Sequence, residues 1–135
     1  MKKEYVLLGI ALIVIVVGGA FFYYFRGVIF IPTSVRIANE ASALSEKGNF
    51  EQAIEKYQKA LASDPNDPAL LAQIVRNIAL KGNVTGAESV AFQEAQPYAE
   101  RALQAGQDDF GVLVAVGYLY ETSGRYEEAL AYYQQ

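Results

Sequence analysis

The sequence contains no cysteine and no histidine among its 135 residues. Disulfide bonds, zinc sites, thiolate or imidazole metal ligands, and catalysis by Ser-His or Cys-His pairs are therefore excluded. A lipid anchor attached through a cysteine is excluded for the same reason. Because cysteine-free proteins occur in every redox compartment, this absence does not indicate where the protein is located.

Positive charge is scarce after residue 31. Residues 1–31 carry three basic residues against one acidic residue, a balance of +2. Residues 32–135 carry eight lysines and arginines against fourteen aspartates and glutamates, a balance of −6. Because an acidic surface repels phosphate groups, we expect no nucleic-acid partner.

Several carboxylates occur in pairs, but their positions explain them without catalysis. Negative charge is favourable near the start of a helix, and most of the pairs fall there or on an outer helix face. A short segment from Asp64 to Asp67 resembles a calcium loop, yet it lacks the central glycine and the terminal glutamate. We therefore predict no catalytic residue, no cofactor and no metal site, and we expect that the protein is not an enzyme. The pairs are Glu51 and Glu55, Asp108 and Asp109, and Glu127 and Glu128.

The longest apolar run extends from Tyr5 to Phe25 and contains no charged residue. As a helix, this run would span about 30 Å, which is the thickness of a bilayer core. Five aromatic residues end it, and such rings suit the headgroup region. A helix buried in a globular core does not fit, because the run is apolar on every face. The sequence predicts a transmembrane anchor in residues 1–31, with membrane contact through residues 5–25.

Lys2 and Lys3 precede this run and favour a cytoplasmic N-terminus. They predict a single-pass membrane protein whose later residues are exported to the periplasm or the cell exterior, although Arg26 weakens this bias. Two alternatives stay open. The later residues would be cytosolic in the opposite orientation, and cleavage after Ala20 would make the run a signal peptide.

Residues 34–67 show the pattern of two antiparallel helices. Apolar residues recur at helical spacing up to Gly48 and Asn49, which end the first helix. A second apolar stripe extends from Phe50 to Leu61, until the Asp-Pro-Asn-Asp-Pro segment stops the helix and turns the chain.

This pattern recurs in two later copies. Residues 124–130 repeat residues 48–54, and Gly82 with Asn83 is predicted to end the first helix of a middle copy. This alignment requires extra residues within residues 84–96. Either a capping box at Thr85 to Glu88 starts the next helix early and leaves Pro97 inside it, or Pro97 begins a shorter helix after a separate turn.

Small and large side chains alternate in these copies at defined positions. In the first copy they are Ala41, Leu44, Gly48, Phe50, Ala53, Tyr57, Ala60 and Pro65, and in the last copy Gly117, Tyr120, Gly124, Tyr126, Ala129 and Tyr133. With these residues, residues 34–135 resemble the tetratricopeptide repeat (TPR) family, whose unit has 34 residues. The resemblance implies an all-α fold: the transmembrane helix, followed by an α-solenoid of antiparallel helix pairs. The units are 34–67, 68–109 with an insertion, and 110–135.

The last unit stops at Gln135, part-way along its second helix. Ala129, Leu130 and Tyr133 are then expected to form an uncovered apolar face, whereas solenoids need polar capping units. We therefore expect this chain to be a fragment, followed by more repeats or by another domain.

The resemblance also implies a concave groove lined by the first helix of each unit. Arg76 and Tyr118 are the strongest candidates for peptide anchors there, because a cation and an aromatic ring lie beside small residues. The alternative is that Arg76 is merely solvated and that Tyr118 packs against the next unit. The groove residues are Ala38, Ser42, Ser45 and Glu46 from unit 1, Ala72, Arg76 and Leu80 from unit 2, and Val114, Tyr118 and Glu121 from unit 3.

Some members of this family hold a C-terminal carboxylate with lysine and asparagine on these helices. Ala38 and Ser42 stand at the corresponding positions of unit 1, so we expect that clamp to be absent. The resemblance implies a membrane-anchored scaffold or adaptor for protein or peptide partners in an envelope or membrane assembly. The alternative is a non-catalytic targeting or regulatory part of a larger enzyme, whose catalytic domain lies beyond residue 135. The sequence indicates neither the partner nor the oligomeric state.

Overall fold

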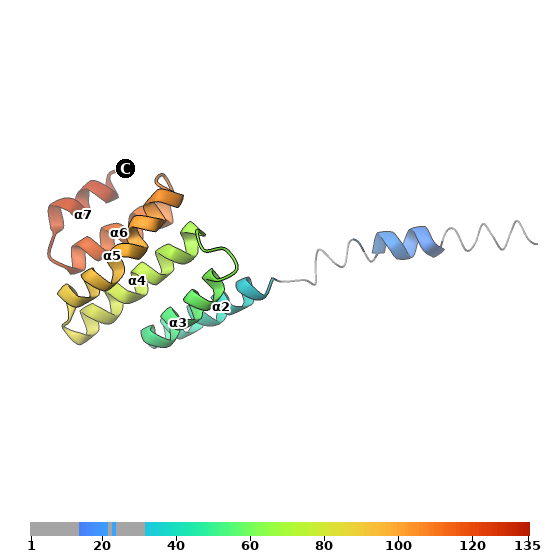
Figure 1. Cartoon of the computed structure of the whole chain (residues 1–135), viewed down its shortest axis with the longest axis horizontal. Coiled ribbons are helices and arrows are strands. Elements are labelled where there is room, and N and C mark those ends of the chain that lie inside the picture. The colour runs from blue at the N-terminus through green and yellow to red at the C-terminus, as the bar shows by residue number, and fades with distance from the viewer. Residues whose placement is uncertain (1–13, 22, 24–31) are drawn as a thin grey trace, which may run out of the picture. The chain divides into compact units, whose positions relative to one another are not determined.

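The computed structural model describes residues 14–21, 23 and 32–135. The chain divides into two compact units, Met1–Pro32 and Thr33–Gln135, and each is considered by itself. The described residues of the second unit form helices and turns, with no strand (Figure 1). Its helices are α2 (Thr33–Glu46), α3 (Phe50–Leu61), α4 (Pro68–Thr85), α5 (Glu88–Ala105), α6 (Phe110–Thr122) and α7 (Tyr126–Tyr133).

These helices form three consecutive pairs: α2 with α3, α4 with α5, and α6 with α7. The turn within each pair contains a glycine with a positive φ, which is 77° at Gly48, 69° at Gly86 and 77° at Gly124. Glycine adopts this backbone conformation without the penalty that a Cβ atom imposes. The arrangement agrees with the expected solenoid of antiparallel helix pairs.

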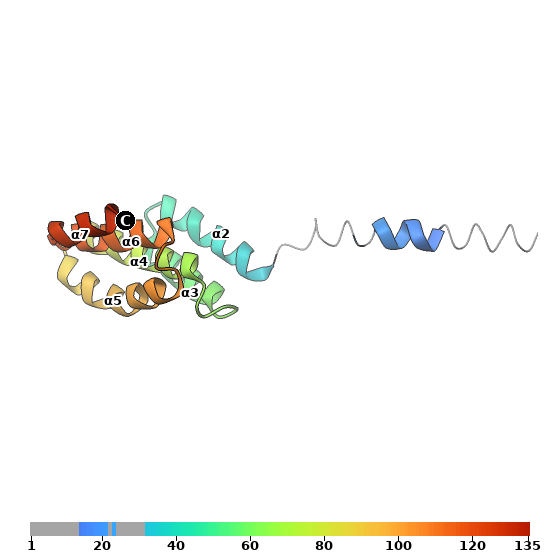
Figure 2. The same cartoon turned by 90° about the horizontal axis from the view of Figure 1, so that it is seen from above.

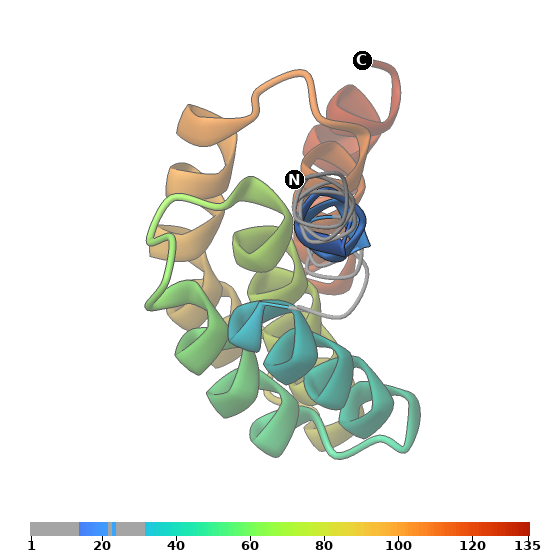
Figure 3. The ribbon, with the colours of Figure 1, turned by 90° about the vertical axis from the view of Figure 1, so that its right-hand side faces the viewer.

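Helix α4 is the centre of the second unit, because it packs against α3, α5 and α6. Figures 2 and 3 show α3 and α5 on one side of α4, and α2, α6 and α7 on the other. The side chains of Leu71, Ile74, Val75 and Ile78 on this helix are fully buried. Burial of a large aliphatic side chain contributes about 1.5–3 kcal/mol. The apolar face of α4 therefore holds neighbouring pairs together.

Helix α4 does not end at Gly82 and Asn83, so that prediction is wrong. The helix continues to Thr85 and ends against Gly86, which is left-handed. Gly82 is buried inside the helix, where an added Cβ would lie only 2.4 Å from the Cβ of Ala91 on α5. Gly82 therefore allows close packing of α4 on α5, and Gly86 is the true counterpart of Gly48.

The middle pair absorbs its extra residues by lengthening both helices. Helices α4 and α5 each have 18 residues, whereas α2 has 14 and α3 has 12. Helix α5 starts early and contains Pro97, as one of the two alternatives predicts. The capping box is wrong, because the Thr85 hydroxyl donates to the carbonyl oxygen of Lys81 at 2.8 Å.

The third pair packs back onto the second through aromatic side chains. The rings of Phe92 on α5 and Tyr120 on α6 meet edge to face, with centroids 5.2 Å apart. The Arg125 guanidinium lies 4.9 Å from the Phe92 centroid and 4.6 Å from the Tyr120 centroid. Such contacts stabilise by about 0.5–1 kcal/mol at exposed sites. Ala129 is buried, contrary to expectation, whereas Leu130 and Tyr133 are exposed as expected.

The predicted transmembrane helix and single-pass localisation need correction. Within residues 14–21, 23 and 32–135, no helix is both long and apolar enough to cross a bilayer. Residues 14–21 are helical. The rest of the predicted span, apart from residue 23, lies outside the described residues.

Candidate functional site

A cavity of about 260 Å³ lies between α4 and α6. Residues three or four positions apart on a helix share one face, and two such faces form this cavity. We call it the α4–α6 cavity. Most of its lining is apolar, and its polar side chains are Gln73, Arg76 and Asp109. The lining residues are Ala69, Ala72, Gln73 and Arg76 in the first half of α4, Asp109 just before α6, and Phe110, Gly111, Val114 and Ala115 in the first half of α6.

Three of the residues expected to line a groove, Ala72, Arg76 and Val114, come together in this cavity. The proposed pairing of Arg76 with Tyr118 is not formed there, because Tyr118 is not in the lining. An aromatic ring is nevertheless present, since Phe110 takes part. The other candidates, Ala38, Ser42, Ser45, Glu46, Leu80 and Glu121, also lie outside the cavity.

Phe110 is the functional candidate that the sequence reasoning missed. It is the first residue of α6 and is 81% exposed, whereas Val112 and Leu113 after it are buried. Asp109 fixes this helix start, because its Oδ1 accepts a hydrogen bond from the Val112 amide at 3.1 Å. The available signal was the spacing of four residues between Phe110 and Val114, which places both on one face.

Arg76 is exposed and forms no ion pair with any carboxylate of the described residues. Some other cations of the second unit are engaged in ion pairs, whereas Lys47 and Lys59, like Arg76, form none with the described residues. Lys81 lies 3.0 Å from Glu94, and Lys56 pairs with Glu40. The guanidinium of Arg76 therefore keeps its charge and its planar set of donors available at the α4–α6 cavity.

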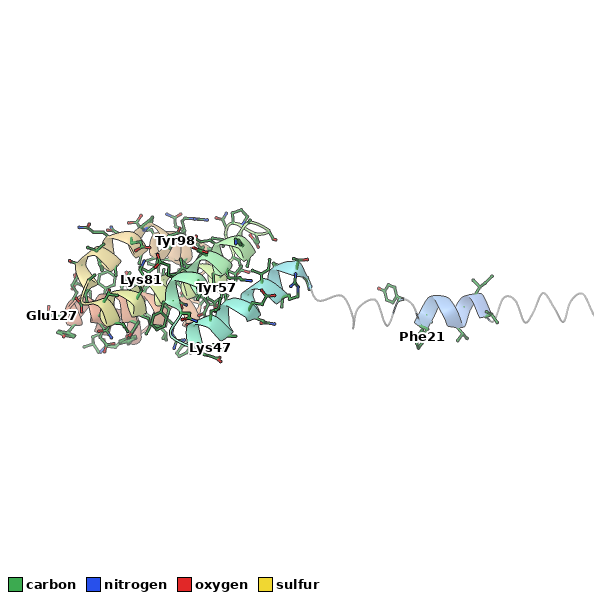
Figure 4. All side chains as sticks on the ribbon, turned by 90° about the horizontal axis from the view of Figure 1, so that it is seen from below. Phe21, Lys47, Tyr57, Lys81, Tyr98 and Glu127 are labelled. Carbon is green, nitrogen blue, oxygen red and sulfur yellow. The ribbon has the colours of Figure 1, made fainter. Side chains whose placement is uncertain are left out.

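Tyr57 on α3 is a buried residue whose pKa is influenced by Ser42 and Glu46 on α2 and by Arg76 on α4. Tyr57, labelled in Figure 4, is 3% exposed. Burial raises the pKa of Tyr57, and the Glu46 charge raises it further, whereas a hydrogen bond with Ser42 and the Arg76 charge lower it. Candidates from two units thus act on the same hydroxyl, although only Arg76 reaches the cavity.

Tyr118 and Glu121 belong to a separate group near α7. The Tyr133 hydroxyl donates to Oε2 of Glu121 at 2.7 Å. Tyr133 is 44% exposed, and its partial burial, this hydrogen bond, the Glu121 charge and Tyr118 together raise its pKa to about 12. Tyr118 itself is half-buried against the core. Gly117 makes room for the Tyr133 ring, since an added Cβ would lie 2.4 Å from its Cε1.

The described part of the chain contains no group of three or more acidic, histidine or cysteine side chains that could hold a metal ion. Asp64 and Asp67 are engaged in local structure instead. The Asp64 carboxylate accepts from the Asn66 amide at 3.2 Å, and Asp67 accepts from the amides of Ala69 and Leu70 at 2.9 and 3.1 Å. Both therefore stabilise a turn and the start of α4.

Comparison with known proteins gives two family matches. Residues 41–74 match a family model described as "TPR repeat", and residues 91–135 match one described as "Tetratricopeptide repeat". The chain is also 37% identical over 78 residues to a protein from Streptomyces avermitilis named chorismate synthase. That match covers 51% of this chain but 20% of the Streptomyces protein, so the chain spans a small part of that relative's length.

Proposed function

Because the chain is a tetratricopeptide repeat protein, we propose that it holds a segment of a partner protein in the α4–α6 cavity. Repeats of this type form protein-interaction scaffolds, and their stacked helix pairs present extended surfaces. The proposal specifies which surface of this chain binds the partner. A partner segment would lie across α4 and α6, with one or two side chains inserted between them.

The observation that carries this proposal is the convergence of Arg76, Phe110 and Val114 on one cavity. Sites for drug-sized molecules usually measure about 300–1,000 Å³, and this cavity of about 260 Å³ is smaller. Its size therefore suits side chains of a peptide better than a cofactor. Exposed aromatic and arginine side chains are also the residues that most often anchor protein interfaces.

We propose that this role is non-catalytic. Of the polar side chains in the lining, the Asp109 carboxylate accepts the Val112 amide hydrogen bond at the start of α6. A guanidinium carries only hydrogen-bond donors and no acceptor, so Arg76 cannot act as a general base. Gln73 does not titrate. No nucleophile with an adjacent base is found in the lining of this cavity, which supports binding without chemistry.

The proposal is tested with the full chain as bait in an extract of the source organism. Val114 is 37% exposed, so Val114→Arg can be accommodated while its side chain fills the cavity. Gln93→Arg on an exposed part of α5 adds the same charge elsewhere. We expect Val114→Arg to lose the captured partners at least tenfold, as about 1.4 kcal/mol of binding energy would produce, and Gln93→Arg to keep them. Equal capture by both variants would disprove the assignment of this cavity.

A second candidate function has one observation in its favour, the partial match to the Streptomyces protein named chorismate synthase. Under this proposal the repeats would be a non-catalytic targeting or regulatory part of a larger enzyme. The full amino-acid sequence of the natural gene product distinguishes the two. A product with a further domain of different composition favours the enzyme arm, and a product that contains only repeats rules it out.

A further inference from the structure

We infer that the α4–α6 cavity selects one aspartate or glutamate side chain of the partner, next to an aliphatic or aromatic side chain. This inference rests on the proposed function, because it assumes that a partner segment occupies the cavity. It adds the chemistry by which that segment is recognised. The carboxylate would pair with Arg76, and the apolar neighbour would pack on Phe110 and Val114.

The first support is that the guanidinium of Arg76 has no partner among the described residues. In the second unit, Lys81, Arg101 and Arg76 each lie in the lining of a separate cavity. Lys81 is paired with Glu94, and Arg101 donates to the carbonyl oxygen of Pro65. Arg76 forms neither kind of contact with the described residues. Its fork of donors matches a carboxylate, with which arginine forms paired, charge-assisted hydrogen bonds.

The second support is the apolar surface beside this cation. Phe110 is 81% exposed and Val114 is 37% exposed, while Ala72 and Ala115 form a buried floor. A side chain that covered Phe110 and Val114 would remove apolar surface from water at about 25 cal/mol per Å². It would also shield the Arg76 pair from solvent, which strengthens the electrostatic attraction. The two parts of the cavity therefore favour a carboxylate and an apolar group side by side.

The surrounding charge limits the ligand to a single carboxylate. Asp109 lies in the same lining, and residues 32–135 carry a balance of −6. A run of acidic residues would be repelled by this field, whereas one carboxylate can pair with Arg76. We therefore expect the partner segment to carry one isolated acidic residue and to be otherwise neutral or basic.

The test uses random peptides displayed on phage, with each peptide C-terminus fused to the coat protein. Only aspartate and glutamate side chains then supply carboxylates from the peptide. Peptides are selected on the full chain, on Arg76→Glu and on Lys59→Glu. Lys59 is an exposed cation on α3 that lines none of the three cavities. The Lys59→Glu variant therefore reproduces the charge change away from the site. Circular dichroism and thermal unfolding check that each variant is folded.

We expect peptides from the unchanged chain and from Lys59→Glu to be enriched in one acidic residue beside an apolar residue. On Arg76→Glu, lysine or arginine should replace the acidic residue while the apolar neighbour stays. A selected acidic peptide should bind Arg76→Gln about tenfold more weakly, as expected for a lost charge-assisted hydrogen bond. Selected peptides without an acidic preference, or with one that survives Arg76→Glu, would overturn the inference and leave the proposed function standing. If the folded, unchanged chain selects no peptide, both are overturned.

Discussion

At the scale of single residues, side chains of the same type have different roles. Asp108 and Asp109 are equivalent in the sequence, yet Asp109 accepts the hydrogen bond from the Val112 amide that begins α6. Glu121 and Glu127 are both exposed carboxylates, yet Glu121 accepts from Tyr133 across two helices. Such differences depend on which atoms the turns bring within reach, and spacing along the chain does not reveal them.

The Tyr133 hydroxyl reports on this local environment. Its pKa is raised from 10.0 to about 12, first by burial and then by the hydrogen bond and charge of Glu121. Glu121→Gln should lower this pKa but leave it above 10.0, since burial remains. Glu127→Gln should leave it unchanged, because Glu127 is not among the causes. Titration of ¹³C-labelled tyrosine by NMR measures each case, and an unchanged pKa in Glu121→Gln would contradict the contact.

The raised pKa has a consequence for stability with a defined sign. The folded state binds the Tyr133 proton more tightly than the unfolded chain, whose pKa is about 10. The contribution of Tyr133 to stability is therefore fully present below pH 10 and is lost as the pH rises through about 12. Glu121→Gln should lower the pH at which the contribution of Tyr133 to stability is lost.

Site residues were only partly predictable from the sequence. Arg76 and Val114 were recognised because the family pattern places them on first helices, and both reach the cavity. Phe110 begins the third unit in the sequence, but it was not among the residues expected to line the groove. Its exposure is decided by the packing of α6 on α4, which lies far away in the sequence. Tyr118 was favoured for its chemistry, but its ring is half-buried against the core.

At the scale of helices, the turn glycines were the strongest signal and also the source of one error. Gly48, Gly86 and Gly124 are each separated by 38 residues, and each is followed five residues later by an alanine. Gly82 competes with Gly86 in the sequence because it is followed by Asn83, as Gly48 is followed by Asn49. Only the close approach of α5 to α4 shows that Gly82 serves packing.

A substitution at Gly82 tests the close packing of α5 on α4. Gly82→Ala would gain about 1 kcal/mol of helix propensity, but its Cβ would lie 2.4 Å from the Cβ of Ala91, which cannot rotate away. Overpacking of this kind costs about 1–3 kcal/mol, so we expect a net loss of stability. Urea unfolding followed by circular dichroism measures it. The double substitution Gly82→Ala with Ala91→Gly should recover part of the loss, and a Gly82→Ala chain more stable than the original would refute the close contact.

At the scale of the whole molecule, the repeat architecture was predictable and the N-terminal assignment was not. Helical spacing and turn residues are local signals that recur in every copy, so the helix pairs could be recognised before their packing was known. The membrane assignment depended on a single apolar run. No helix of the described residues is long and apolar enough for a span, and most of that run lies outside the described residues.

The charge of the second unit also acts at this scale. A balance of −6 surrounds Arg76, which has no carboxylate partner among the described residues, so the α4–α6 cavity attracts an anion within a repulsive field. Fields of this kind favour selectivity over general affinity for acidic ligands. We therefore expect few partners, each with an isolated acidic residue at the point of contact.

The most direct measurement of the central claim is photo-cross-linking from inside the α4–α6 cavity. Benzoylphenylalanine replaces Phe110, which is 81% exposed, and in a second chain it replaces Tyr126, which is 70% exposed at the start of α7. Both substitutions keep an aromatic ring, so the two chains differ in the position of the probe. After irradiation in an extract of the source organism, we expect mass spectrometry to find partner peptides joined to position 110 and not to position 126. Cross-links to position 126 alone, or to neither position, would contradict the account.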